Sequence, residues 1–476
     1  MSQYKTAAKD RVPAIQKAAF GAGHLVNNLM PGALAIFMFF LLTAFGMDPF
    51  MAGLLGGLPR LVDAISDPIM GYISDNTNTR WGRRRPYIFI GAILTGLMFM
   101  LLWQMDESNS QTYNFWYFLI ISAIFILANT AFSTPLIGLG YEMTSDYNER
   151  TRLMGLANIV GQFAWMLVPW FWVLIADKNI FETQAEGVRK LSIAVGVIAI
   201  VFGVLPALFC KGIDSSKIEN RQEISLKNLL AIFKSLFKGI IEVFRHKPFL
   251  KLCGATFLVF NGFQIVASFS FFIILFYIFR GDYALAGNWP AWFSTILAVL
   301  TAFFVIPIVS WMANKWGKKN AFIVSTAISI VGYGLKWWGF NPENPYMMFM
   351  PLPLMAFGLG CLFTLMMSMT ADICDLDELE NGMPRKEGTF GAIYWWTVKL
   401  GQALALIVGG AVLKWVGFDQ NAAMQSAETL TQLRIADIVI PAITAGLAIV
   451  VMWKYSLSEE KARAIKAELE RRRGQL

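Results

Sequence analysis

Two acidic residues stand close together in an apolar stretch at about residues 50–74. Asp63 and Asp67 are four positions apart, so on a helix their carboxylates project from one face, about one turn from each other. Carboxylates this close in a medium of low dielectric constant share a proton or bind a cation, because both cannot stay charged and bare. Ser66 adds a hydroxyl oxygen beside them. The spacing predicts a binding site for a hard cation such as Na+.

A lysine lies deep in a later apolar stretch. Lys399 needs an anionic partner, a proton exit or water there, because a charged amine is costly inside a membrane. If its partners are Asp63 and Asp67, a cation and Lys399 would compete for the same carboxylates. This competition would couple the binding of the cation to the pairing of Lys399. The alternative is that the acids pair with Arg60 or Lys399 and only join helices. Lys336 lies nearer the end of its stretch and is expected to snorkel to the membrane surface.

The elements that must hold these residues are long and apolar. Of the 476 residues, 56% are hydrophobic and 15% are charged, whereas about a quarter of a soluble protein is charged. This composition argues against a soluble enzyme and against a disordered chain. Blocks of roughly 20 apolar residues or more, the length that crosses a membrane as a helix, predict an all-α membrane protein. The twelve blocks lie at about residues 20–45, 50–74, 86–104, 114–142, 153–176, 189–210, 250–279, 290–313, 320–340, 346–371, 389–417 and 433–455.

A basic turn occurs twice, at an interval close to half the chain. Arg80–Arg85 reads RWGRRR and Lys315–Lys319 reads KWGKK, each between equivalent blocks. The repeat predicts a transporter built from two duplicated halves that rock about a central site. The tail is expected to form a solvated helix. The predicted organisation is an N-terminal six-helix half at 1–210, a cytoplasmic central loop at 211–249, a C-terminal six-helix half at 250–456 and a cytoplasmic tail at 457–476.

Basic residues are distributed unevenly between the two sides that the blocks define. With the first residues in the cytoplasm, most of the 40 Lys and Arg face that side, so both termini are predicted to be cytoplasmic. The net charge of +8 reflects this topology and attraction to anionic lipid headgroups, and no nucleic-acid partner is expected. Four cysteines without a CxxC pair and two histidines predict neither a disulfide framework nor a metal centre. No cofactor is therefore expected besides a coupling ion.

Two longer motifs together resemble one family of transporters. The first is Asp67–Gly71 (DPIMG), followed by Asp75 and the turn Arg80–Arg85; the second is Ala371–Glu378 (ADICDLDE), followed by Arg385–Gly388 (RKEG). They resemble the glycoside–pentoside–hexuronide:cation symporters of the major facilitator superfamily, and the resemblance covers essentially the whole chain. It implies the major facilitator fold, with twelve transmembrane helices in two pseudo-symmetric six-helix halves. It also implies transport by alternating access in a bacterial inner membrane.

The resemblance implies roles for individual residues. The family's cation site falls on Asp63, Ser66 and Asp67, together with Thr130 of the fourth block. Lys399 matches the family's lysine beside the cation and sugar sites. Both acids and the Thr130 hydroxyl are kept, so Na+ is the expected coupling ion. The alternative is H+, which a protonated Asp67 would carry alone.

The positions that match the family's sugar site differ in type from those of galactoside-carrying relatives. Asn27 and Ser133 stand where those relatives have acidic residues, Ile137 replaces an aromatic residue and Asn158 replaces an arginine. Amides donate and accept hydrogen bonds, whereas carboxylates only accept, so a different sugar is implied, either a neutral glycoside or an acidic sugar. The remaining predicted substrate-binding residues are Gln162, with a further amide, Tyr394 and Trp395, with rings that could stack on a sugar, and Lys399, which would bind an acidic group.

Charged residues at the cytoplasmic ends of the blocks form a predicted cytoplasmic gate. Opposite charges on facing ends of the two halves would pair to close the cytoplasmic side and separate when it opens. Exposed pairs contribute only about 0–1 kcal/mol each, which suits a gate that must open readily. The residues are Asp75, Arg80, Arg83, Arg84, Glu142, Asp146 and Arg150 in the first half, and Asp372, Asp375 and Arg385 in a loop of the second.

These features together predict a membrane transporter that carries a small sugar or glycoside, neutral or acidic, in symport with Na+ or H+. Two alternatives remain open: a carrier of lysolipids or other amphiphiles with the same fold, and a sugar sensor that does not transport. No nucleophile–histidine pairing or metal-ligand cluster stands out in the sequence, so an enzyme is not expected. The expected partners are the sugar and the lipid bilayer, and a monomer suffices for the mechanism.

Overall fold

The computed structural model describes four segments of the chain: residues 11–144, 147–212, 246–381 and 387–473. Every element in these segments is helical, which confirms the predicted all-α class. The chain divides into two compact units, each considered by itself: residues 1–232 (unit 1) and 233–476 (unit 2). The predicted central loop at 211–249 contains this division, and all but its ends lie outside the described segments.

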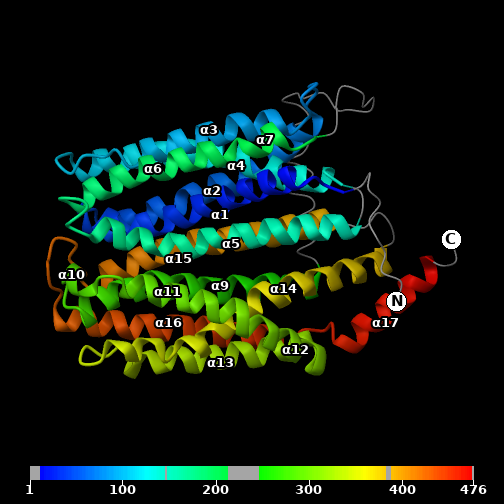
Figure 1. Ribbon diagram of the computed structural model, residues 1–476. Helices are drawn as coiled ribbons and strands as arrows, with labels where there is room; N and C mark the ends of the chain where they lie inside the picture. Colours follow the sequence, from blue (N-terminus) through cyan, green and yellow to red (C-terminus); the bar gives the residue numbers. More distant parts are fainter. Residues whose placement is uncertain (1–10, 145–146, 213–245, 382–386, 474–476) are drawn as a thin grey trace. The chain divides into compact units, whose positions relative to one another are not determined.

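Among the helices of unit 1, α2, α4 and α6 begin at side chains that accept hydrogen bonds, and α1, α3 and α7 begin next to prolines. Asp48, Ser110 and Thr183 cap α2, α4 and α6 by accepting hydrogen bonds from first-turn N–H groups. α1 packs against α5, α3 against α4 and α6, and α2 against α4 (Figure 1). The elements are α1 (Ala14–Thr43), α2 (Pro49–Asn76), α3 (Arg85–Leu102), α4 (Gln111–Glu142), α5 (Tyr147–Ala176), α6 (Gln184–Gly203) and α7 (Leu205–Phe209).

Glycines let the helices of unit 1 approach closely. A Cβ at Gly91 of α3 would lie 2.6 Å from the backbone nitrogen of Phe132 in α4. A Cβ at Gly96 would lie 2.5 Å from the carbonyl oxygen of Gly196 in α6. Such backbone contacts through small residues are typical of helices that pack within a membrane. They hold α4, which contributes to the site below, against its neighbours.

Unit 2 has one continuous core and two π-helical interruptions. α9 continues directly into the π-helix η3, and a second π-helix, η4, joins α11 to α12. The core is formed by apolar side chains of α9, α12, α13, α14, α15 and α16. The elements are α9 (Lys247–Phe272), η3 (Ile273–Ile278), α10 (Tyr283–Ala286), α11 (Trp289–Leu300), η4 (Thr301–Val305), α12 (Ile306–Trp316), α13 (Lys318–Gly339), η5 (Pro345–Phe349), α14 (Leu352–Asn381), α15 (Glu387–Trp415), α16 (Ala427–Trp453) and α17 (Glu459–Arg473).

Eleven helical runs in the described segments are long and apolar enough to cross a membrane. The sequence predicts twelve spans, and the remaining one is α2. At 28 residues and 1.5 Å per residue, α2 is about 42 Å long, which is ample for a span. Its central part carries Arg60, Asp63 and Asp67, which lower its hydropathy. The twelve-helix arrangement therefore holds, and the span with the least apolar sequence is the one with the predicted cation site.

Two predictions about the ends of unit 2 elements are wrong. Asp372 and Asp375 are expected in a loop, but they lie on α14, which continues to Asn381. No glycine or proline interrupts the chain between Asp372 and Asn381, so the helix persists beyond its apolar part. The tail helix α17 is not fully solvated: Ile465 and Leu469, four residues apart on one face, are buried in the core cluster, and α17 packs against α14.

Candidate functional site

A cluster of oxygen atoms lies where α2 packs against α4. The hydroxyl of Thr130 donates to Oδ1 of Asp63 at 3.2 Å and lies 3.0 Å from Oγ of Ser66. Ser66 also hydrogen-bonds to the backbone carbonyl of Asp63, at 3.3 Å. The three side chains are 7%, 6% and 1% exposed for Asp63, Ser66 and Thr130. Three of the four residues predicted to bind the cation are therefore in direct contact inside unit 1.

The fourth predicted residue, Asp67, makes a parallel contact one turn along. Thr134 of α4 donates from Oγ1 to Oδ1 of Asp67 at 3.2 Å, and Asp67 is half-buried. Both Asp–Thr pairs span 67 residues, because one four-residue step on α2 matches one four-residue step on α4. Thr134 was missed by sequence reasoning, which chose its neighbour Ser133. The shared four-residue spacing of the two threonines could have identified it.

Prolines next to these residues add to the supply of oxygens. Pro68 follows Asp67 within α2, and Pro135 follows Thr134 within α4. A proline inside a helix has no N–H for the carbonyl four residues earlier. The carbonyls of residues 64 and 131 are thus released from that helical bond beside the cluster. Carboxylate, hydroxyl and carbonyl oxygens are the donors that hard cations prefer, and a carboxylate can take up a proton in place of a metal ion.

The sequence leaves open whether Arg60 and Lys399 pair with the acidic residues of this cluster. Arg60, one turn before Asp63 on α2, interacts electrostatically with Asp63. Lys399 lies half-buried on α15, in unit 2. Its competition with a cation for Asp63 and Asp67 joins residues of different units and stays a prediction.

The predicted substrate residues of unit 1 lie on three helices. Asn158 and Gln162 are exposed on α5, Asn27 of α1 and Ser133 of α4 are half-buried, and Ile137 of α4 is 42% exposed. Two exposed amides four residues apart near the middle of a membrane span form a polar stripe on α5.

The aromatic residues predicted to bind substrate in unit 2 differ in accessibility. Trp395 is 45% exposed and has ring surface available. Tyr394 is 2% exposed and packs in the core cluster. The expectation that Tyr394 stacks on a sugar is therefore wrong for this structure. Consecutive helical residues point about 100° apart, so exposure of Trp395 turns Tyr394 into the core.

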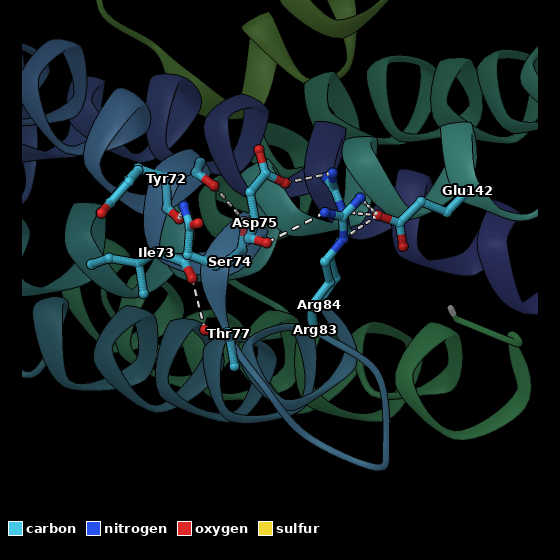
Figure 2. Close-up of polar contacts among 10 residues, drawn as sticks. Tyr72, Ile73, Ser74, Asp75, Thr77, Arg83, Arg84 and Glu142 are labelled. Atoms are coloured by element: carbon cyan, nitrogen blue, oxygen red, sulfur yellow. Dashed lines mark hydrogen bonds and ion pairs between the residues drawn. The ribbon is translucent and has the colours of Figure 1, made fainter. Parts of the chain in front are cut away.

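Four of the predicted gate residues of unit 1 form ion pairs with one another within that unit. Nε of Arg83 and Nε of Arg84 donate to the same oxygen of Glu142, at 2.6 and 2.7 Å (Figure 2). Arg84 also donates from Nη2 to Oδ1 of Asp75 at 2.7 Å. These contacts join the end of α2, the start of α3 and the end of α4. The Glu142 side chain is 6% exposed and that of Asp75 is 50% exposed. The pairs with Glu142 therefore differ from the exposed pairs that the sequence predicts, whereas the Arg84–Asp75 pair is partly exposed.

Gly138 explains how Arg84 reaches its partners. A Cβ at this position would lie 1.0 Å from Nη1 of Arg84, so the guanidinium passes over α4 where a side chain is missing. Unit 2 has a related pair, in which Nζ of Lys318 contacts Oδ2 of Asp372 at 2.6 Å. Lys318 belongs to the second copy of the basic turn. Each copy is therefore ion-paired to a helix of its own unit, the first to α4 and the second to α14. The other predicted gate residues are exposed Arg80, half-buried Asp375, and Asp146, Arg385 and the Arg150 side chain, which lie outside the described part of the chain.

A second buried ionic cluster, in unit 2, was missed by sequence reasoning. Lys336 of α13 is not at the membrane surface, as expected, but 0% exposed and ion-paired with Asp437 of α16, which is 1% exposed. Lys336 also donates to Oγ of Ser270 at 3.2 Å. The Arg434 guanidinium carbon lies 4.1 and 4.4 Å from the ring centroids of Tyr277 and Trp337. Arg434 and Asp437 are three residues apart at the start of an apolar block, and this pair of charges could have indicated the cluster from the sequence.

Comparison with known proteins gives consistent matches over nearly the whole chain. Residues 19–459 match the family model described as MFS/sugar transport protein. The chain is 25% identical to the glucuronide carrier protein homolog of Escherichia coli (strain K12), covering 95% of both chains. It is 24% identical to the isoprimeverose transporter of Lactiplantibacillus pentosus, covering 98% of this chain and 93% of that protein. It is also 25% identical to the sodium-dependent lysophosphatidylcholine symporter 1-B of Danio rerio, covering 96% and 90%.

Solved structures match the fold at lower sequence identity. A bacterial homolog of the human lysosomal transporter Spinster, in an inward-facing and unoccupied conformation, superposes with a TM-score of 0.67. The identity is 16%, and the match covers 93% of this chain and 98% of that one. A D-xylose–proton symporter matches with a TM-score of 0.57 at 16% identity, covering 92% and 97%. At these identities the likeness is one of fold.

Proposed function

We propose that this chain, which belongs to the family of MFS/sugar transport proteins, carries a sugar or glycoside across the membrane in symport with a cation. The protein is a multi-pass membrane transporter, and its family and relatives are transporters rather than enzymes. Its two units would alternate access to the bound substrate and ion, as expected for transporters built from two repeats.

The observation that carries the coupling proposal is the oxygen cluster of Asp63, Ser66 and Thr130. Asp63 is buried beside Arg60, with which it interacts electrostatically, and the hydroxyls of Ser66 and Thr130 add oxygen atoms of the kind that a small hard cation prefers. Asp67 and Thr134 add a second carboxylate–hydroxyl pair one turn away. Na+ is the proposed ion, supported by the number of oxygens, and H+ is the alternative. The sodium-dependent relative adds support for Na+.

The proposed substrate is a neutral glycoside or an acidic sugar. Relatives named as a glucuronide carrier homolog and an isoprimeverose transporter support this class. The exposed amides of Asn158 and Gln162 would each donate and accept hydrogen bonds with sugar hydroxyls. Lys399 would bind the carboxylate of an acidic sugar, so the choice between neutral and acidic sugars depends on this residue.

Uptake into proteoliposomes tests the proposal directly. Purified protein is reconstituted, and entry of labelled isoprimeverose and of a labelled glucuronide is followed under an inward Na+ gradient, an inward H+ gradient, or neither. We expect one sugar class to accumulate only when one cation gradient is present. Binding without gradient-dependent accumulation of any glycoside would contradict symport and favour a sensor.

A pair of variants tests the ion site. Asp63→Asn keeps the size and polarity of the side chain but removes its charge, so gradient-driven accumulation is expected to be lost. Asp106→Asn, at an exposed loop position, is the matched control and should accumulate sugar like the unmodified protein. Unchanged Na+ stimulation in Asp63→Asn would remove this carboxylate from the ion site.

A second candidate substrate is a lysolipid or another amphiphile. The relative from Danio rerio supports it, as does an exposed apolar strip on α5 formed by Ile159, Phe163 and Leu167. The same proteoliposomes, supplied with labelled lysophosphatidylcholine, distinguish the two. A lipid carrier would move the lysolipid and ignore both sugars.

The proposed location is the inner membrane of a bacterium, with both termini in the cytoplasm. The distribution of basic residues and the bacterial relatives support it. A fluorescent-protein fusion after Leu476 should fluoresce, and an alkaline-phosphatase fusion at the same point should be inactive. The opposite pair of results would reverse the topology.

A further inference from the structure

One face of α5 carries a polar stripe through the middle of a membrane span. Asn158, Gln162 and Trp165 are spaced four and three residues apart, so they share a face over two turns. All three are exposed, with Trp165 41% exposed. The span runs over Arg152–Ala176, which puts Gln162 and Trp165 close to its centre.

The stripe is distinct from the apolar side of the same helix. Ile159 and Phe163, 60% and 52% exposed, lie about 100° further around α5 than Asn158 and Gln162. Side-chain amides do not face hydrocarbon at the centre of a bilayer, because their hydrogen-bonding groups would be unsatisfied there. The face with Asn158 and Gln162 therefore borders water, and the exposed indole of Trp165 lies on that face.

The indole of Trp165 is held in a defined orientation by α1. Its Nε1 donates to Oδ1 of Asn28 at 3.0 Å. Asn28 in turn donates from Nδ2 to the backbone carbonyl of His24 at 2.9 Å. Because Nδ2 must face that carbonyl, Oδ1 is left to accept from the indole. The pyrrole edge of Trp165 is thus fixed against α1 while its ring surface remains accessible.

A glycine makes this arrangement possible. A Cβ at Gly161 of α5 would lie 2.6 Å from Nδ2 of Asn28. Any larger residue would push the Asn28 amide away from both of its partners. The contact is therefore built from three positions on two helices, rather than being a chance contact of an exposed tryptophan.

We infer that Trp165, aligned by Asn28, is the platform on which a sugar ring of the transported glycoside stacks; this rests on the proposed function. The C–H face of a sugar ring packs on an indole, and its hydroxyls at the ring edge need donors and acceptors. Gln162 and Asn158 supply these at about 4.5 and 10 Å along the helix axis from Trp165, at 1.5 Å per residue. A stripe of this length suits a substrate of two rings, with Gln162 at the stacked ring and Asn158 at the next.

The first experiment measures the apparent KM for glycoside uptake. Trp165→Ala is expected to raise it about tenfold, the effect of losing a favourable aromatic contact, with little change in the Na+ concentration for half-maximal uptake. Trp165→Phe keeps a ring but loses the N–H, and Asn28→Ala loses the acceptor, so each should raise KM by a similar, smaller factor. The double variant Trp165→Phe/Asn28→Ala should be no worse than either single variant, because both remove the same hydrogen bond.

The second experiment tests whether the stripe faces water. The four native cysteines are free and buried, so Gln162→Cys can be labelled selectively with a charged methanethiosulfonate reagent. Gln162→Cys is expected to react, and the two-ring sugar should slow the reaction. Ile159→Cys, on the apolar side of α5, is the matched control and should not react. The assignment would be overturned if both variants were labelled equally. It would also be overturned if Gln162→Cys still transported sugar but did not react with the reagent.

The outcomes separate this inference from the proposed function. If the unmodified protein takes up a glycoside and Trp165→Ala retains its KM, the platform is wrong and symport stands. If the unmodified protein takes up no glycoside, both are wrong. A variant with altered uptake but an unfolding temperature close to that of the unmodified protein rules out misfolding as the cause.

Discussion

Each unit of the molecule buries a carboxylate, and the two are treated differently. Asp63 in unit 1 is 7% exposed, accepts a hydrogen bond from the hydroxyl of Thr130 and interacts electrostatically with Arg60. Asp437 in unit 2 is 1% exposed and is ion-paired with the ammonium of Lys336. A hydroxyl can turn its oxygen toward a metal ion, whereas an ammonium neutralises the carboxylate permanently. The first arrangement suits reversible binding of a cation, and the second suits a fixed connection between helices.

The unit 2 pair is embedded in contacts that join four helical elements. Lys336 on α13 reaches Ser270 at the end of α9, and Arg434 on α16 lies between the rings of Tyr277 in η3 and Trp337 in α13. Tyr277 belongs to the π-helix η3. The comparison therefore predicts that disturbing unit 2 affects folding, while disturbing unit 1 affects ion binding.

The largest expected effect follows from removing one partner of the unit 2 pair. Asp437→Leu leaves the Lys336 ammonium buried without its carboxylate, which costs about 3–5 kcal/mol of folding stability. Replacing both residues, as Lys336→Met/Asp437→Leu, should recover much of this loss. Unfolding is followed with a thiol-reactive dye, because all four cysteines are free and buried. A double variant as unstable as Asp437→Leu would contradict the fixed-pair interpretation.

A smaller effect, dependent on the ion, is expected at Asp63. The unmodified protein should be stabilised by Na+ by about 2.7 kcal/mol at one hundred times its dissociation constant. Asp63→Asn should lose this gain and unfold at nearly the same temperature in Na+ and K+. The measurement is the dye-reported unfolding temperature in the two buffers, with Asp106→Asn as control. If Na+ stabilised Asp63→Asn as much as the unmodified protein, the Asp63 carboxylate would not bind the cation, and its role would be structural like that of Asp437.

The hydroxyls of α4 should contribute less than the carboxylates. Thr134→Val removes the donor to Asp67 but keeps the shape of the side chain, and a hydrogen bond of this kind contributes about 1 kcal/mol. Cation affinity is then expected to fall about fivefold, read from the Na+ dependence of uptake. Thr134→Ser keeps the hydroxyl and serves as the control. If both variants behave alike, the Thr134 hydroxyl takes no part in ion binding.

The smallest effect is expected for an ion pair at the aqueous end of unit 1. Glu149 accepts from Lys17 at 2.6 Å and from the Val12 N–H at 3.0 Å, and the Lys17 hydrogen bond is the main reason that the pKa of Glu149 is lowered. A lowered carboxyl pKa means that the pair stabilises the fold above the ordinary pKa of glutamate and ceases to do so as pH falls through the lowered one.

Glu149→Gln should therefore reduce the loss of stability on acidification. The measurement is the unfolding temperature as a function of pH for both proteins. If Glu149→Gln changed stability more than Asp63→Asn does, the position of a carboxylate relative to the membrane would not determine how much it contributes to stability.

Sequence alone sufficed for features that depend on local pattern. Hydropathy over about 20 residues identifies eleven of the spans, and the repeated basic turn predicts two halves. The four-residue spacing of Asp63 and Asp67 puts them on one face of α2 whatever surrounds that helix. The family resemblance added Thr130, and the structure brings it to Asp63 because α2 and α4 pack side by side.

Only the tertiary structure decided which distant residues meet. Lys336 pairs with Asp437 across 101 positions of the sequence, and neither residue's neighbours in the chain reveal the other. Three further features depend on how helices rotate against one another. They are the exposure of Trp395 with Tyr394 in the core, the burial of Ile465, and the contact of Trp165 with Asn28 beside Gly161. Periodicity specifies the face of a helix, but the partner of that face is chosen by packing and by the cost of leaving buried polar groups unsatisfied.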